Sequence, residues 1–139
     1  MEQFTKNKLS SFLKEYGFEL VKIVNNDSLG QRFYAEFRKG NLFLTLEKSF
    51  YRPDNQELLI MLCDASVDLE GMSNCCSTYC IIRFKYRKPV TTYLDEPSEL
   101  LHSFDLIIHD LENYCRDFLE GDEEAFRETL LTVLKLRGG

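Results

Sequence analysis

The sequence has no tryptophan, three prolines and seven glycines among its 139 residues. So few chain-breaking residues exclude a collagen-like or low-complexity chain. The composition is 44% hydrophobic and 13% aromatic, which is typical of a folded domain rather than a disordered segment. We therefore expect one domain over residues 1–139, long enough to bury a core without the help of a disulfide or a metal.

Long apolar runs are also lacking. The longest, residues 58–63, has the length of a buried strand and falls far short of the roughly 20 residues that a membrane-spanning helix needs. The first residues contain no apolar core of a signal peptide, so we expect a cytoplasmic protein that does not insert into a membrane. No nucleophile elbow, phosphate-binding glycine loop, zinc-protease helix or EF-hand loop is present. The sequence therefore predicts no enzyme activity, no catalytic residue and no cofactor.

The sequence has fewer basic than acidic residues, and its charge is unevenly distributed. Seventeen basic residues against 23 acidic ones leave a net charge of −6, which disfavours nucleic acid as a partner. Residues 1–80 carry a net charge of −2, residues 81–93 carry +4, and residues 94–139 carry −8. The acidic excess therefore belongs to the C-terminal third of the chain.

Periodicity divides the first half of the chain into a helix and strands. Apolar residues spaced by three and four predict a helix over residues 5–16 that ends at Gly17. Residues 18–24 are typical of a strand, and turn-forming residues 25–30 follow. Residues 32–38 and 42–46 then alternate between apolar and polar side chains around Gly40, which indicates a β-hairpin.

The middle of the chain predicts two further strands. Residues 57–63 are apolar on both faces, as in a central strand, and they follow a turn at residues 51–55. Residues 64–78 lack periodicity and are interpreted as a long loop. Residues 79–86 alternate again, with aromatic side chains on one face and an outward basic row of Arg83, Lys85 and Arg87 on the other. We expect this row to pair with Glu36 or Glu47 on neighbouring strands, with an acidic partner as the alternative.

The last third predicts two helices. One long amphipathic helix is expected over residues 98–120, closed by Gly121, and Asp122 is expected to cap a final helix. The order of elements shows no alternation of strands and helices. It therefore favours an α+β fold with an antiparallel sheet of about five strands, an N-terminal helix and two C-terminal helices packed on it.

Two clusters raise the question of metal or redox chemistry. Cys63, Cys75, Cys76 and Cys80 depart from the paired spacing of zinc sites, and five cysteines without a secretion signal predict reduced thiols. The predicted long helix carries His102, Asp105, His109 and Glu112 on one face, but the two histidines lie about 10 Å apart along the axis and cannot share one ion. We therefore predict no metal ligands, and keep a thiol-based metal-binding or redox-linked regulator as the alternative function.

The chain resembles the small acidic immunity proteins of bacterial polymorphic-toxin systems in its organisation. The resemblance depends on residues 16–18 at the end of the first helix, the Gly40 hairpin, the long helix over residues 100–119, and Gly121-Asp122 before a short last helix. It implies neutralisation of a toxin by binding, often through an acidic surface that covers a basic active site. The last six residues separately resemble the conjugation tail of ubiquitin, although a helix end with a glycine stop explains the same residues.

The leading hypothesis is therefore a non-enzymatic module that binds a basic protein, such as a toxin domain. The identity of the partner and the choice between monomer and homodimer stay open. The candidate partner-binding residues are the acidic side chains of the predicted C-terminal helices: Asp105, Asp110, Glu112, Asp117, Glu120, Asp122, Glu123 and Glu124.

Overall fold

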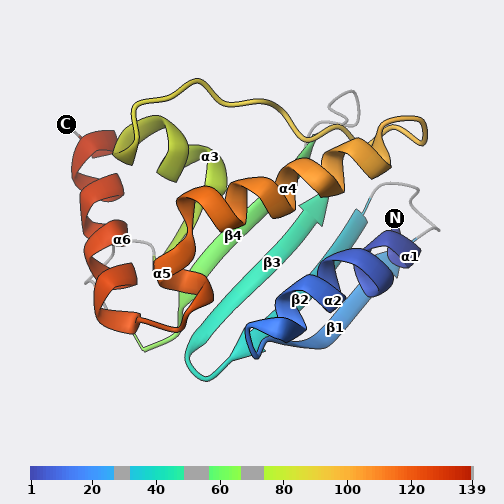
Figure 1. The fold of residues 1–139 in the computed structure, drawn as a ribbon, viewed down its shortest axis with the longest axis horizontal. Helices are drawn as coiled ribbons and strands as arrows, with labels where there is room; N and C mark the ends of the chain where they lie inside the picture. Colours follow the sequence, from blue (N-terminus) through green and yellow to red (C-terminus); the bar gives the residue numbers. More distant parts are fainter. Residues whose placement is uncertain (27–31, 49–56, 67–73, 139) are drawn as a thin grey trace.

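A five-stranded antiparallel sheet forms the centre of the protein (Figure 1). The computed structural model describes residues 1–26, 32–48, 57–66 and 74–138. Residues 27–30 of the expected turn 25–30, the expected turn at residues 51–55 and residues 67–73 of the expected loop 64–78 lie outside them, whereas residues 75–77 of that loop form a strand. Each strand pairs with its neighbour in the sequence, in the order β1-β2-β3-β4-β5, which confirms the α+β class. The strands are β1 (Glu19–Asn26), β2 (Arg32–Lys39), β3 (Leu42–Lys48), β4 (Leu58–Asp64) and β5 (Cys75–Ser77).

The hairpin between β2 and β3 is the one that the sequence predicts. Lys39 pairs with Leu42 across the turn, and Gly40 has a φ of 60°, a conformation that favours glycine. Alternation places Phe33, Ala35 and Phe37 on the inner face of β2, where they are buried. The tip of this hairpin therefore has a defined position relative to the core.

The N-terminal helix is continuous but changes its winding. It consists of α1 (Glu2–Phe4), a π-helical stretch η1 (Thr5–Leu9) and α2 (Ser10–Glu15). Gly17 ends it with a φ of 91°, and the amide of Phe18 donates to the carbonyl of Leu13 at 3.0 Å. This is the glycine-dependent helix end that the sequence predicts.

The predicted long helix over residues 98–120 is divided. Helix α4 (Leu100–Tyr114) ends at Cys115, which leaves helical geometry at φ −129° and ψ 32°, and α5 (Arg116–Leu119) begins directly after it. The carboxylate of Asp117 accepts the amide of Phe118 at 2.7 Å and so satisfies one of the donors that a new helix start leaves open. The expectation of a single helix was wrong because no proline or glycine marks this break.

Helix α6 (Glu123–Gly138) begins where the sequence predicts it. The side chain of Asp122 accepts the amide of Ala125 at 3.1 Å, which confirms the expected cap. The helix continues through Gly138, so most of the segment that resembles the ubiquitin tail is helical, and Gly139 lies outside the described residues. Within the described part of the chain, no helix combines the length and apolarity needed to cross a membrane.

The strand predicted over residues 79–86 is in fact helical. Helix α3 (Thr78–Cys80) continues into the π-helical η2 (Ile81–Lys85), and the fifth strand is the short β5 before them. The side chain of Ser77 accepts the amide of Cys80 at 3.1 Å and starts this helix. Ile81 and Ile82 are both buried, which adjacent residues of a half-exposed strand cannot be.

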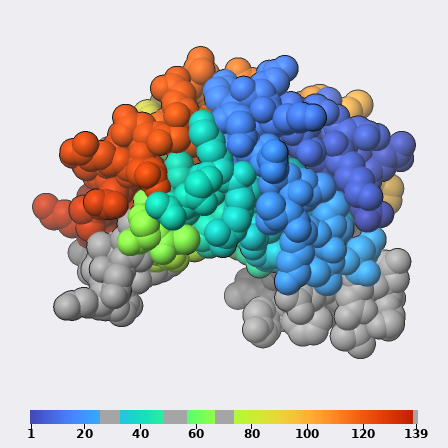
Figure 2. Space-filling model, turned by 90° about the horizontal axis from the view of Figure 1, so that it is seen from below, coloured from blue at the N-terminus to red at the C-terminus, as the bar shows by residue number. Residues whose placement is uncertain are grey.

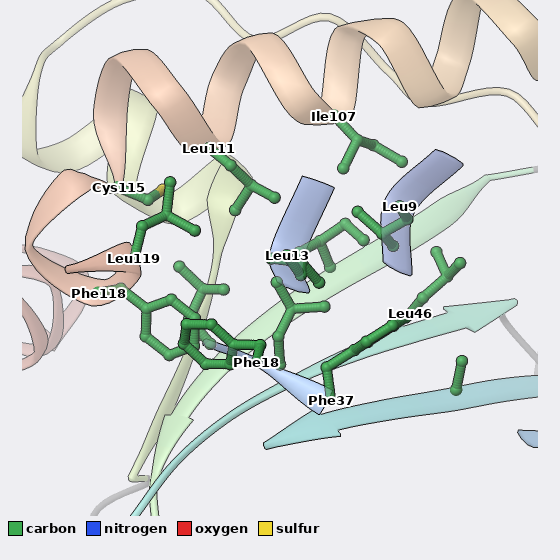
Figure 3. Packing of buried hydrophobic residues seen from close by; sticks show 14 of the residues in the cluster. Leu9, Leu13, Phe18, Phe37, Leu46, Ile107, Leu111, Cys115, Phe118 and Leu119 are labelled. Atoms are coloured by element: carbon green, nitrogen blue, oxygen red, sulfur yellow. The ribbon is translucent and has the colours of Figure 1, made fainter. Parts of the chain in front are cut away.

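One layer of helices covers one face of the sheet. Figure 1 shows α1, α2 and α4 side by side over this face and α6 at its β5 end. In Figure 3, Leu9 and Leu13 of the N-terminal helix lie between Ile107 and Leu111 of α4 and the sheet residues Phe37 and Leu46. All of these side chains are fully buried. The core therefore joins segments about 100 residues apart in the sequence.

Candidate functional site

The eight acidic residues predicted as a binding surface divide into two groups. Three of them, Asp110, Asp117 and Glu123, have buried or partly buried side chains. The other five are exposed, namely Asp105, Glu112, Glu120, Asp122 and Glu124. Asp105 is paired with Lys8 of the N-terminal helix, and Glu120 lies 3.8 Å from Arg116. The predicted surface is therefore smaller than the sequence indicates.

Asp110 belongs to a buried hydrogen-bond chain and not to the surface. The hydroxyl of Tyr93 donates to its Oδ2 at 2.7 Å, and the hydroxyl of Thr78 lies 2.9 Å from the Tyr93 hydroxyl. Nδ1 of His109 lies 3.3 Å from the other carboxylate oxygen. Burial, followed by the charge of Asp110, raises the pKa of Tyr93 well above its usual range, so this hydroxyl remains a donor. Asp110 holds Tyr93 against α4.

Asp117 joins three elements. Its Oδ2 accepts the hydroxyl of Thr129 from α6 at 2.7 Å, and this hydroxyl accepts the ammonium group of Lys85 from η2 at 2.8 Å. Lys85 Nζ also lies 3.8 Å from the carboxylate. Since its Oδ1 also accepts the amide of Phe118 in the first turn of α5, the carboxylate of Asp117 is committed to the fold. The pairing of Lys85 with Glu36 or Glu47, expected from the sequence, does not occur.

The basic segment, residues 83–88, lies against the acidic helices. Besides the Lys85 contact, the ammonium group of Lys88 lies 5.7 Å from the ring centre of Tyr114 at the end of α4. Arg83 and Arg87 are exposed and make no ion pair within the described residues. The outward basic row predicted from strand alternation is therefore wrong, because these residues follow helical geometry and part of their charge is compensated within the chain.

What remains of the acidic surface is concentrated at the turn between α5 and α6. We call Glu120, Asp122, Glu123 and Glu124 the acidic corner. Gly121 has a φ of 76°, and the amide of Asp122 donates to the carbonyl of Asp117 at 3.0 Å, which fixes the turn. Asp122, Glu123 and Glu124 surround the first turn of α6, where the helix dipole stabilises negative charge.

Lys39 supports the acidic corner from the hairpin tip. Its carbon chain approaches Gly17 and Gly121, and its ammonium group donates to the carbonyl of Leu119 at 3.4 Å. Both glycines follow helix ends, where carbonyl groups carry partial negative charge, so a cation between them is favourable. In Figure 2 the hairpin, in teal, lies between the N-terminal segment in blue and the C-terminal helices in orange and red.

The histidine face of α4 does not assemble a metal site. His102 and His109 are exposed, and the carboxylates nearest to them in sequence are engaged elsewhere, Asp105 with Lys8 and Asp110 with Tyr93. Among the residues that the structure describes, no group of three or more histidine, cysteine or acidic side chains is placed to hold a metal ion.

The cysteines contradict the prediction of reduced thiols at two positions. Cys63 on β4 and Cys75 on β5 form a disulfide across the strand pair. Cys76 and Cys115 are buried free thiols, and burial raises the pKa of Cys76 to about 12 and that of Cys115 well above its usual value. Cys80 is a partly buried free thiol. The four-cysteine cluster considered from the sequence is therefore divided between a disulfide and two free thiols, Cys76 and Cys80.

Sequence reasoning missed four residues that shape this region: Thr78, Tyr93, Thr129 and Lys39. Each acts through a partner at least 12 positions away, so no local pattern marks it. A tyrosine isolated between Thr92 and Leu94, in a segment without periodicity, was the only available signal for Tyr93.

The fold and the acidic corner define an α+β protein with a charged surface at the junction of two helices. Comparison with protein-family models, with curated proteins and with solved structures returned no match. Function is therefore inferred from the geometry and charge of this chain.

Proposed function

We propose that this chain is a non-enzymatic protein-binding module whose acidic corner binds a basic protein, in the manner of an immunity protein that neutralises a toxin. The observation that carries the proposal is the concentration of four carboxylates within five consecutive residues at one turn, Glu120 to Glu124. Acidic surfaces of this kind accelerate association with basic partners and select against acidic ones.

The rigidity of the corner supports the same proposal. Phe118, Leu119 and Phe126, which flank the turn on both sides, are fully buried, and the Phe118 ring packs against the rings of Phe18 and Phe126 at about 5 Å. A surface held by core residues loses little conformational entropy on binding, and more of its interaction energy then appears as affinity.

Among the described residues, three of the four corner residues take part in no ion pair; the exception is Glu120, which lies 3.8 Å from Arg116. Asp105 and Asp117 have cations beside them, in Lys8 and Lys85. Within the described residues, by contrast, no ion pair engages Asp122, Glu123 or Glu124. Unpaired surface carboxylates are the ones that a basic partner can engage without first breaking an internal contact.

Affinity capture from the native host, followed by kinetics at several salt concentrations, tests the proposal. We expect one basic protein to be recovered and its association rate to fall as salt rises. A Glu120→Gln, Asp122→Asn, Glu124→Gln variant should slow association at least tenfold, since asparagine keeps the helix cap while the charges are lost. A Glu2→Gln, Glu19→Gln variant is the control for exposed acids elsewhere. Salt-independent association, or equal effects of both variants, would contradict the proposal.

A second candidate is a redox-linked regulator, and the disulfide between Cys63 and Cys75 favours it over the metal-binding form. Disulfides are rare in reducing compartments and are often regulatory there. If the protein is cytoplasmic, as the sequence predicts, the bond would form and break with the redox state of the cell. Binding of the partner by oxidised and by reduced protein distinguishes the candidates: equal affinities would exclude the regulator, and a stoichiometric zinc in reduced protein would restore the metal form.

A further inference from the structure

A small cavity lies beside the acidic corner. It has a volume of about 270 Å³ and separates the tip of the β2–β3 hairpin from the turn between α5 and α6, two segments that lie side by side in Figures 1 and 2. Ligand pockets for drug-sized molecules begin near roughly 300 Å³, so this cavity suits a single side chain. It is lined by Lys39, Gly40, Asn41, Leu42, Gly121 and Glu123.

Glu123 gives the cavity an unsatisfied acceptor. Its Oε1 is buried and has no hydrogen-bond partner within the described part of the chain. A buried acceptor without a donor costs on the order of 1–3 kcal/mol, so native structures rarely leave one. The terminal torsion of glutamate is soft, and the carboxylate can therefore turn toward a donor that enters the cavity. Asn41, which is exposed, also lines the cavity.

Lys39, the one cation among the described residues that line the cavity, is already compensated. Lys39 directs its ammonium group to the carbonyl of Leu119 and lies beside the ends of two helices, at Gly17 and Gly121. The partial negative charges of these helix ends offset its own charge. The other carboxylates of the acidic corner, those of Glu120, Asp122 and Glu124, belong to residues adjacent in sequence to the lining residues Gly121 and Glu123. The net field at the cavity therefore favours a positive group.

We propose that this cavity receives an arginine side chain of the basic partner, with its guanidinium group bonded to the carboxylate of Glu123. Guanidinium offers five N–H donors in a planar fork that matches a carboxylate, and it is more weakly hydrated than the ammonium group of lysine. Arginine is also among the residues that dominate binding when they occupy a pocket near the centre of an interface. The inference rests on the proposed function and adds to it the residue type that the partner contributes.

Titration of the ¹⁵N-labelled protein with Nα-acetyl-arginine methylamide tests the cavity without the partner. We expect saturable shifts of the amides of Gly40, Asn41 and Gly121, and none with the citrulline analogue, which has the same shape and no charge. Glu123→Gln should lower the affinity for the arginine probe at least tenfold. Glu124→Gln, which removes an equal charge outside the cavity, should change this affinity by less than twofold. Glu123→Asp keeps the charge and should retain measurable binding.

Several outcomes would overturn the inference. They are the absence of saturable shifts, equal shifts with citrulline, and equal losses in Glu123→Gln and Glu124→Gln. The dispersed amide spectrum of each variant reports that it is folded. If the partner binds Glu123→Gln as tightly as the unmodified protein but loses affinity when the other three corner residues are neutralised, the proposed function stands and the cavity inference fails. If no basic partner exists while the arginine probe still binds at the cavity, the proposed function fails and the cavity still binds a guanidinium group.

Discussion

The disulfide between Cys63 and Cys75 makes a quantitative prediction about stability. The bond closes a loop between positions 12 residues apart on β4 and β5. In the chain-entropy model, closing a loop of this length lowers the entropy of the unfolded state and so raises the free energy of unfolding by about 3 kcal/mol at 25 °C. For a chain of this size each kcal/mol corresponds to roughly 3–4 °C in melting temperature, so we expect a fall of about 10 °C when both cysteines are replaced by alanine.

The assay compares thermal unfolding with and without a dithiol reductant. The melting temperature of the unmodified protein should fall by the same roughly 10 °C on reduction. That of the Cys63→Ala, Cys75→Ala variant should not change with the reductant. Cys80→Ala, which removes a free thiol, should leave the response intact. A thiol titration of the denatured, unreduced protein should find three thiols out of five cysteines. Five titratable thiols, or a melting temperature that ignores the reductant, would refute the reasoning.

Three further predictions follow from buried or paired polar groups. Tyr93→Phe should lower the free energy of unfolding by about 2–3 kcal/mol in urea, because it leaves the buried Asp110 carboxylate without its donor; a change below about 0.5 kcal/mol would contradict this. Lys39→Met should lower the free energy of unfolding by about 1 kcal/mol, because it keeps the packing of the carbon chain but removes the charge at two helix ends. An unchanged urea midpoint would show that this charge does not stabilise the helix ends. The hydrogen bond from the hydroxyl of Tyr34 is the main cause that holds the pKa of Glu36 below its usual range. This pair therefore stabilises the protein fully at pH values above the usual pKa of a glutamate. The stabilisation is lost as the pH falls through the lowered pKa of Glu36. Tyr34→Phe should raise the pKa of Glu36 in an NMR titration, and an unmoved titration would show that the hydroxyl is not the cause.

Local patterns were sufficient for the elements whose signals are short-range. Gly17, Gly40 and Gly121 all take positive φ at the positions where the sequence predicts a helix end or a tight turn. Asp122 caps α6 as expected. At these positions one residue type satisfies a backbone requirement that few others meet, so the sequence alone is informative.

The failures have a common physical origin in non-local contacts. The alternation at residues 79–86 fits a strand, but burial of both Ile81 and Ile82 and the cap from Ser77 make the segment helical. Asp110 shares the polar character of its exposed neighbours and becomes buried because Tyr93, 17 residues earlier, supplies a donor. Tertiary packing of this kind outweighs local propensity, and a single sequence does not show it.

The same non-local contacts explain why the candidate surface was overestimated. Asp110 and Asp117 are among the acidic side chains of the predicted C-terminal helices. The break at Cys115 changes the direction of the chain, and Asp117 then faces Thr129 and Lys85. The acidic corner itself was accessible from the sequence, because its residues lie within five positions around Gly121, where a helix is predicted to end.

The sequential order of the strands has a consequence for the timing of folding during synthesis. All five strands are contained in residues 19–77, and each one pairs with the strand made just before it. The inner face of this sheet, however, is covered in part by Ile107 and Leu111 of α4, which are synthesised later. At roughly 5–20 residues per second the interval lasts a few seconds. During that time a paired sheet presents leucine and phenylalanine side chains that α4 does not yet cover, and the nascent chain is then most exposed to aggregation.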